Sequence, residues 1–157
     1  NHMFRRKVPF DAILIISQIC AMSVSFYLSY VVFILIADCF FSLPFTIQSI
    51  INPSVFHFST KMGWITILGE LFGGIISSLI FVFLEGKFKK ALDFISTTFI
   101  IHLIIITLLC EFPKNFCWWI STISSFLIST FTAGKISMNY EMQAINLDSI
   151  FPSALRN

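Results

Sequence analysis

Three ionisable residues lie inside long apolar stretches of this sequence: Glu70, Asp93 and His102. An ionisable side chain in an apolar segment costs free energy and is a candidate for function by default. Residues 85–90 form a charged segment between the apolar stretch that holds Glu70 and the one that holds His102. At 1.5 Å per helical residue, Glu70 lies about 22 Å from this segment along one helix, and His102 lies about 18 Å from it along the next. At similar depth, the two side chains form a hydrogen bond if both face inward. Three interpretations stay open. The pair is a structural clasp, with Glu70 charged or protonated; it is part of a path for protons or ions; or the two side chains make no contact.

Other residues that could do chemistry are few. The sequence has no Ser/His/Asp arrangement, no glycine-rich phosphate loop, no pair of catalytic carboxylates and no Cys/His set with zinc spacing. We therefore expect neither an enzyme nor a metal or cofactor site. Cys110 and Cys117 flank the segment EFPKN at 111–115, and either form a disulfide or stay reduced. Asp93 lies just inside the start of a predicted helix, where the helix dipole favours an acidic side chain.

The composition indicates that lipid surrounds most of the chain. Of its 157 residues, 57% are hydrophobic and only 11% are charged, whereas a soluble domain has roughly 25% charged residues. So short a chain has too much surface to bury this apolar load in one core. Nucleic acid is not an expected partner, because the net charge is only +2 and no extended basic surface is evident.

Four apolar runs are each long enough, or nearly so, for the roughly 20 residues of a membrane-spanning helix. We predict an all-α membrane protein with four transmembrane helices and both termini in the cytosol. The helices are expected at residues 12–37, 62–84, 91–110 and 116–134. Between and beside them we expect a cytosolic N-terminus (1–11), a luminal loop (38–61), a cytosolic turn (85–90), a luminal turn (111–115) and a cytosolic tail (135–157).

The orientation follows from the basic residues. Lys87, Lys89 and Lys90 lie in the short segment between the second and third spans, which predicts a tight antiparallel hairpin. With four spans, eight of the ten Lys and Arg residues lie on the face that holds this segment and both termini. Basic residues are retained on the cytosolic side of a membrane, so this face is predicted to be cytosolic.

Small residues recur on two of the spans. Gly69 and Gly73 have GxxxG spacing, and Ser121, Ser125 and Ser129 follow at steps of four. Small side chains let transmembrane helices approach closely. These glycines and serines allow close packing of helices either within one chain or between the two chains of a homodimer, and both possibilities stay open.

Seven short strings then point to a family. In chain order they are DAILIISQI (11–19), IADCF (36–40), FST (58–60), ALDF (91–94), IIHL (100–103), FPKNFCWW (112–119) and YEMQAINL (140–147). Together with the four spans, this ordered set resembles the SYS family of small Golgi integral membrane proteins. The resemblance implies a receptor that recruits an ARF-related small GTPase, whose N-terminus is acetylated, to the trans-Golgi. There the GTPase supports golgin recruitment and vesicle traffic.

A docking surface can be placed on this expectation. Acetylation removes the charge of an amino terminus, so a neutral acetyl-methionine could enter an apolar crevice where a free ammonium would be costly to desolvate. We place the crevice at the cytosolic face, within the set Asp11, Lys87, Lys89, Lys90, Asp93, Tyr140 and Glu141. Two alternatives stay open: a small oligomeric carrier or channel that uses Glu70 and His102, and a purely structural scaffold.

Overall fold

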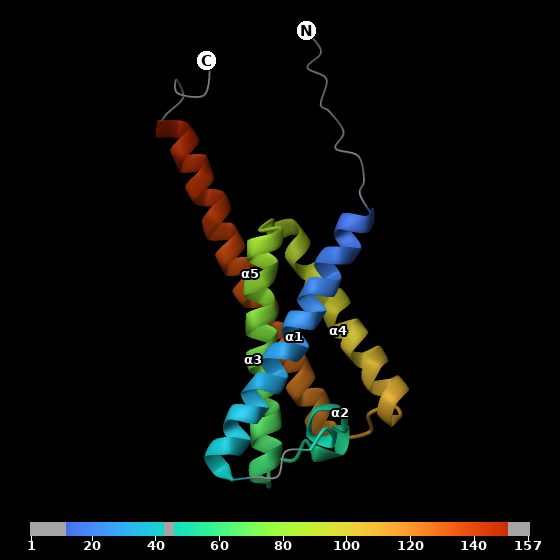
Figure 1. Cartoon of the computed structure of the whole chain (residues 1–157). Helices are drawn as coiled ribbons and strands as arrows, with labels where there is room; N and C mark the ends of the chain where they lie inside the picture. Colours follow the sequence, from blue (N-terminus) through green and yellow to red (C-terminus); the bar gives the residue numbers. More distant parts are fainter. Residues whose placement is uncertain (1–11, 43–45, 151–157) are drawn as a thin grey trace.

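The computed structural model describes residues 12–42 and 46–150, and within them it is all helical (Figure 1). Asp11, one of the predicted site residues, lies outside the described residues. Among these residues four helices are long and apolar enough to cross a membrane, which confirms the predicted all-α fold with four spans. The orientation of the termini stays a prediction. The elements are α1 (Ala12–Phe41), α2 (Gln48–Ile51), η1 (Pro53–Val55), α3 (Lys61–Leu84), α4 (Phe88–Cys110) and α5 (Phe116–Ile150).

The helices extend beyond the apolar runs, most of all α5. This helix has 35 residues, and its length of about 52 Å exceeds the roughly 30 Å hydrocarbon thickness of a bilayer. No glycine or proline occurs between Lys135 and Ile150, so nothing in the sequence breaks the helix there. α4 begins three residues earlier than predicted, since the carboxylate of Glu141 accepts a hydrogen bond from the backbone N–H of Phe88 (3.1 Å).

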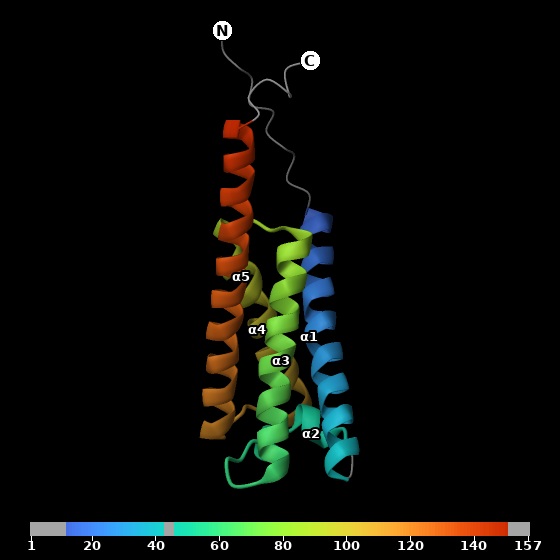
Figure 2. The same cartoon turned by 90° about the vertical axis from the view of Figure 1, so that its left-hand side faces the viewer.

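The four long helices form a ring in which α1 packs against α3, α3 against α5, α5 against α4, and α4 against α1. Figure 2 shows α5, α3 and α1 side by side, with α4 behind them. α3 and α4 therefore lie on a diagonal of the ring, although only the segment 85–87 joins them. The predicted tight hairpin is wrong in this respect, because the two helices are antiparallel but diverge after the turn (Figure 1).

Glycines on two sides of α3 explain this packing order. A Cβ atom at Gly69 or Gly73 would lie about 2.9 Å from atoms of Tyr30 or Phe26 on α1. At Gly74, a Cβ would meet hydroxyl groups of α5 at 2.4 and 2.6 Å. Both sides of α3 are thus occupied by closely approaching helices, and α4 packs elsewhere. The GxxxG stripe is covered by α1, which favours its use in packing within one chain.

The bundle has two distinct ends. The start of α1, the α3–α4 turn and the far part of α5 lie at one end, whereas α2, η1 and the α4–α5 turn lie at the other (Figure 1). At this second end Asn115 donates hydrogen bonds to the carbonyl oxygens of Pro53 (2.8 Å) and Phe56 (2.7 Å). A single side chain at the start of α5 therefore holds the loop before α3 in place.

Candidate functional site

A polar cluster lies at the centre of the ring, where α3 meets α5. The Glu70 side chain is fully buried, and both of its carboxyl oxygens have hydroxyl partners on α5. Ser121 Oγ donates to Oε2, and Thr122 Oγ1 donates to Oε1 at 2.8 Å. Ser125 Oγ donates to the backbone carbonyl of Glu70 at 3.0 Å. These bonds fasten α3 to α5 in the interior of the bundle.

His102 reaches the same centre from α4. Its Nδ1 atom shares a hydrogen bond with the hydroxyl of Tyr27 on α1 (2.9 Å), and its ring stacks on Trp118 with centroids 5.9 Å apart. The Nε2 atom lies 3.7 Å from Glu70 Oε1, which is too long for a hydrogen bond. The structure thus brings the two residues together at one depth, across the diagonal of the ring, but without a hydrogen bond between them.

This geometry is that of a clasp between helices. Glu70 and His102 are 0% and 2% exposed, so neither side chain opens to the surface in this structure. The hydroxyl partners of Glu70 were missed by the sequence analysis, although Ser121 and Ser125 stand one turn apart on a single stripe. Among the described residues, no group of three His, Cys, Asp or Glu side chains could hold a metal ion.

At the α3–α4 turn the lysines converge on one carboxylate. Glu85 accepts a hydrogen bond from Lys90 Nζ at 2.5 Å and lies 3.6 Å from Lys87 Nζ. Gln18 of α1 donates to the same carboxylate at 3.3 Å. The bond from Lys90 is the main cause that lowers the pKa of the Glu85 carboxyl below its ordinary value. Glu85 was not predicted as a site residue, yet its position directly before the lysines was a usable signal.

Tyr140 and Glu141 reach this end from α5. Glu141 caps the start of α4 through Phe88, whereas Tyr140 is 61% exposed. Tyr140 lines a hollow of about 370 Å³ between α3 and α5, whose other walls are the apolar side chains of Leu79, Val82, Phe83 and Ile136. Of the predicted crevice residues that the structure describes, Tyr140 alone lines this hollow, and the others are distributed around the same end.

The two remaining predicted residues lie on the first turns of α4. Lys89 and Asp93 are exposed, and within the described part of the chain Asp93 makes no ion pair with the lysines. The four cysteines, Cys110 and Cys117 included, are unpaired thiols in this structure.

Comparison with known proteins identifies the family. The model of the SYS1 family, described as "Integral membrane protein S linking to the trans Golgi network", matches residues 5–147. The chain belongs to the SYS1 family. A Protein SYS1 homolog of Nematostella vectensis is 26% identical over 146 residues, which cover 93% of this chain and 92% of the relative. A Protein SYS1 homolog of Dictyostelium discoideum is 23% identical over 145 residues, which cover 92% of this chain and 62% of the relative. No solved structure matches the chain.

Membership of the SYS1 family confirms the resemblance found in the sequence. The family consists of Golgi integral membrane proteins, and the four apolar helices agree with that description. The description of the SYS1 family names no catalytic activity.

Proposed function

We propose that this protein is a trans-Golgi membrane receptor for an ARF-related small GTPase with an acetylated N-terminus. The GTPase, once recruited, supports golgin recruitment and vesicle traffic. Membership of the SYS1 family supports this proposal, and the four apolar helices agree with it. The end that holds the α3–α4 turn faces the cytosol, because Lys87, Lys89, Lys90 and Lys135 all lie there and basic residues are retained on that side.

The observation that carries the proposal is the hollow beside the projecting part of α5. About 16 residues of α5, from Lys135 to Ile150, follow the apolar part of the helix and exceed the membrane thickness. Tyr140 stands on this part, over the last turns of α3. A partner that approaches from the cytosol therefore meets the exposed residues 138–143 of α5 and, beside them, an apolar hollow.

The hollow suits a neutral acetylated terminus. An amphipathic helix without an acyl chain binds a membrane weakly and needs a second attachment for stable anchoring. The walls of the hollow are apolar side chains, with Tyr140 at the rim. A free ammonium would lose its hydration there without gaining a charged partner, whereas an acetyl group has no charge to desolvate.

The structure also changes the role of the lysines. Two of them, Lys87 and Lys90, are held by Glu85, so they stabilise the turn and set the orientation. We therefore place the docking contacts at Tyr140 and the hollow, and we give the lysine turn only an auxiliary role as a positively charged rim.

Recruitment to liposomes tests the proposal. The full chain is reconstituted, and flotation measures the bound ARF-related GTPase in acetylated and non-acetylated forms. Val82→Trp fills the hollow and should abolish binding of the acetylated form, whereas Leu84→Trp, two residues along α3 and not in the hollow, should leave it intact. Tyr140→Ala should weaken binding, and Met142→Ala on the same helix serves as its control.

Two outcomes would contradict different parts of the proposal. If the Val82→Trp protein recruits the GTPase as well as the unchanged chain, the docking site is misplaced. If cells that lack this protein keep the GTPase on Golgi membranes, the receptor function itself is wrong.

A further inference from the structure

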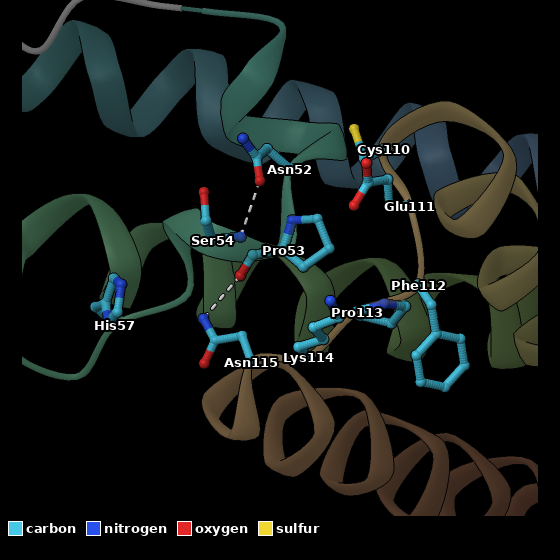
Figure 3. A pocket seen from close by; sticks show the side chains of 10 residues that line it. All are labelled: Asn52, Pro53, Ser54, His57, Cys110, Glu111, Phe112, Pro113, Lys114 and Asn115. Carbon is cyan, nitrogen blue, oxygen red and sulfur yellow. Dashed lines mark hydrogen bonds between the residues drawn. The ribbon is translucent and has the colours of Figure 1, made fainter.

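Figure 3 shows a hollow between the loop before α3 and the α4–α5 turn. Both segments lie at the end of the bundle opposite the α3–α4 turn (Figure 1). The volume of the hollow is about 400 Å³, which is within the range of small-molecule sites. The loop before α3 contributes Asn52 and Ser54 to its wall, and the α4–α5 turn contributes Glu111 and Lys114. Asn115 holds these two walls together through its bonds to the loop.

The hollow holds one carboxylate and one ammonium group that are not used by the fold. Glu111 and Lys114 are both exposed. Within the described residues, neither side chain takes part in an ion pair or in a side-chain hydrogen bond. Because charges of both signs line one hollow, the hollow is complementary to a zwitterion rather than to a simple anion or cation.

Glu111 has an unusual backbone conformation. Its φ of 83° and ψ of 167° fall in a region that is occupied almost only by glycine. Strain of this kind concentrates at ligand-binding sites, where it is part of how a side chain is presented. A glycine would fit this turn without strain, so the presence of a glutamate points to a use for its carboxylate.

A second, apolar groove lies near the hollow, on the two helices that the α4–α5 turn joins. The groove lies between α4 and α5, has a volume of about 260 Å³, and is walled by side chains such as Phe99, Leu103 and Phe126. Trp119 lines the groove, and its Nε1 donates to the carbonyl of Pro113, a residue of the hollow, at 2.9 Å. The groove lies within the membrane-spanning part of α4 and α5, whereas the hollow lies at its end.

We propose that the hollow and the groove together bind one phospholipid with a zwitterionic head group that carries a primary ammonium, as in phosphatidylethanolamine. Lys114 contacts the phosphate, and Glu111 accepts hydrogen bonds from the ammonium, with the Asn52 side chain beside it. An acyl chain lies in the groove along Phe99 and Phe126. A primary ammonium has three N–H donors for these acceptors, whereas the quaternary ammonium of a choline head group has none.

The test uses the purified full chain in detergent micelles and four dioctanoyl probes. These are phosphatidylethanolamine, phosphatidylcholine, phosphatidylglycerol and diacylglycerol, and tryptophan fluorescence and the unfolding midpoint are followed during titration. We expect phosphatidylethanolamine to bind about tenfold more tightly than the other three, as a charge-assisted hydrogen bond predicts. Glycerophosphoethanolamine, which has the head group but no acyl chains, should bind much more weakly.

Variants locate the site. Glu111→Gln should abolish the preference for phosphatidylethanolamine over phosphatidylglycerol. Lys114→Gln should weaken binding of both phospholipids and leave binding of diacylglycerol unchanged. Lys61→Gln, at the same end but outside the hollow, should change neither. Glu111→Gly should raise the unfolding midpoint of the lipid-free protein, because it relieves the strained backbone, and should still lose the preference, which separates binding from folding.

Several results would overturn the proposal. Equal binding of phosphatidylglycerol or phosphatidylcholine would exclude recognition of the ammonium, and equal binding of diacylglycerol would exclude the hollow. Equal binding of the head group alone would exclude the groove, and an unchanged preference in Glu111→Gln would place the site elsewhere. GTPase recruitment is measured at the other end of the bundle, so its outcome is independent of this test.

Discussion

The hydrogen bond between Thr122 and Glu70 offers the sharpest test of the buried clasp. Thr122→Val keeps the shape of the side chain and removes the hydroxyl that donates to Glu70 Oε1 at 2.8 Å. Hydrogen bonds between transmembrane helices contribute about 0.6 kcal/mol on average and about 1.7 kcal/mol at most. Glu70 is fully buried, so the carboxyl oxygen finds no water in place of the lost hydroxyl. We therefore expect a loss near the upper value, about 1.5 kcal/mol.

The assay is reversible unfolding of the purified chain in mixed micelles, followed by tryptophan fluorescence. Thr132→Val is the matched control, because Thr132 Oγ1 bonds to the backbone of its own helix, at the carbonyl of Ile128 (2.8 Å). That bond joins no two helices, so its removal should change the unfolding free energy by about 0.5 kcal/mol or less.

A double-mutant cycle separates the bond from other effects of the substitution. In a Glu70→Met background the acceptor is absent, and Thr122→Val should then cost clearly less than in the unchanged protein. The reasoning is refuted if Thr122→Val and Thr132→Val cost the same, or if the cost of Thr122→Val is unchanged by Glu70→Met. Either result would mean that the carboxyl group does not depend on this hydroxyl.

Three further predictions concern other contacts. Gly74→Ala should destabilise the protein by about 1–3 kcal/mol in the same unfolding assay, because the added Cβ would meet two serine hydroxyls at 2.4 and 2.6 Å. Gly134→Ala is the control and should cost less, because the nearest atom to its Cβ is a ring carbon of Phe88 at 3.3 Å. Asn115→Ala removes two hydrogen bonds to segment 53–56. The free energy of local opening of that segment should fall by about 1–3 kcal/mol, which is measured as faster amide hydrogen exchange. Unchanged exchange would contradict the role of the Asn115 side chain. The Glu85 carboxyl has a folded-state pKa below its ordinary 4.5, so its stabilisation is fully present above that pH and is lost as the pH falls through the lowered pKa. Glu85→Gln should therefore flatten the acid limb of the stability profile, and an unchanged limb would show that the ion pair does not stabilise the fold.

The four spans could be predicted from the sequence because hydropathy reports the solvent around each helix. The packing order could not, because it depends on which faces of α3 are small. Gly73 and Gly74 are neighbours in sequence but lie about 100° apart around a helix, and one faces α1 while the other faces α5. Only the partners across the interface show that both faces are used. The diagonal placement of α3 and α4 follows from that.

In the candidate site, too, some features could be predicted from the sequence and others could not. An ionisable residue in an apolar run identified Glu70 and His102, and the helical rise placed them at one depth. Their partners could not be predicted, because Ser121 and Thr122 differ little in sequence from other hydroxyl residues that bond to their own helix. At the α3–α4 turn, the lysines predicted the orientation, but the contact between Lys90 and Glu85 depends on the conformation of the turn.

The clasp and the proposed docking surface are parts of one mechanical arrangement. Among the described helices, α3 and α4 are the ones that contact α5 most extensively, so the position of its projecting part relative to α3 depends on contacts deeper in the bundle. Those contacts are the hydroxyl bonds to Glu70 and the close approach at Gly74. The docking hollow is walled by α3 and α5 together, and it keeps its shape only while these helices stay in register. A loosened clasp should therefore weaken GTPase recruitment from a distance: Thr122→Val should lower binding in the flotation assay, and Thr132→Val should not.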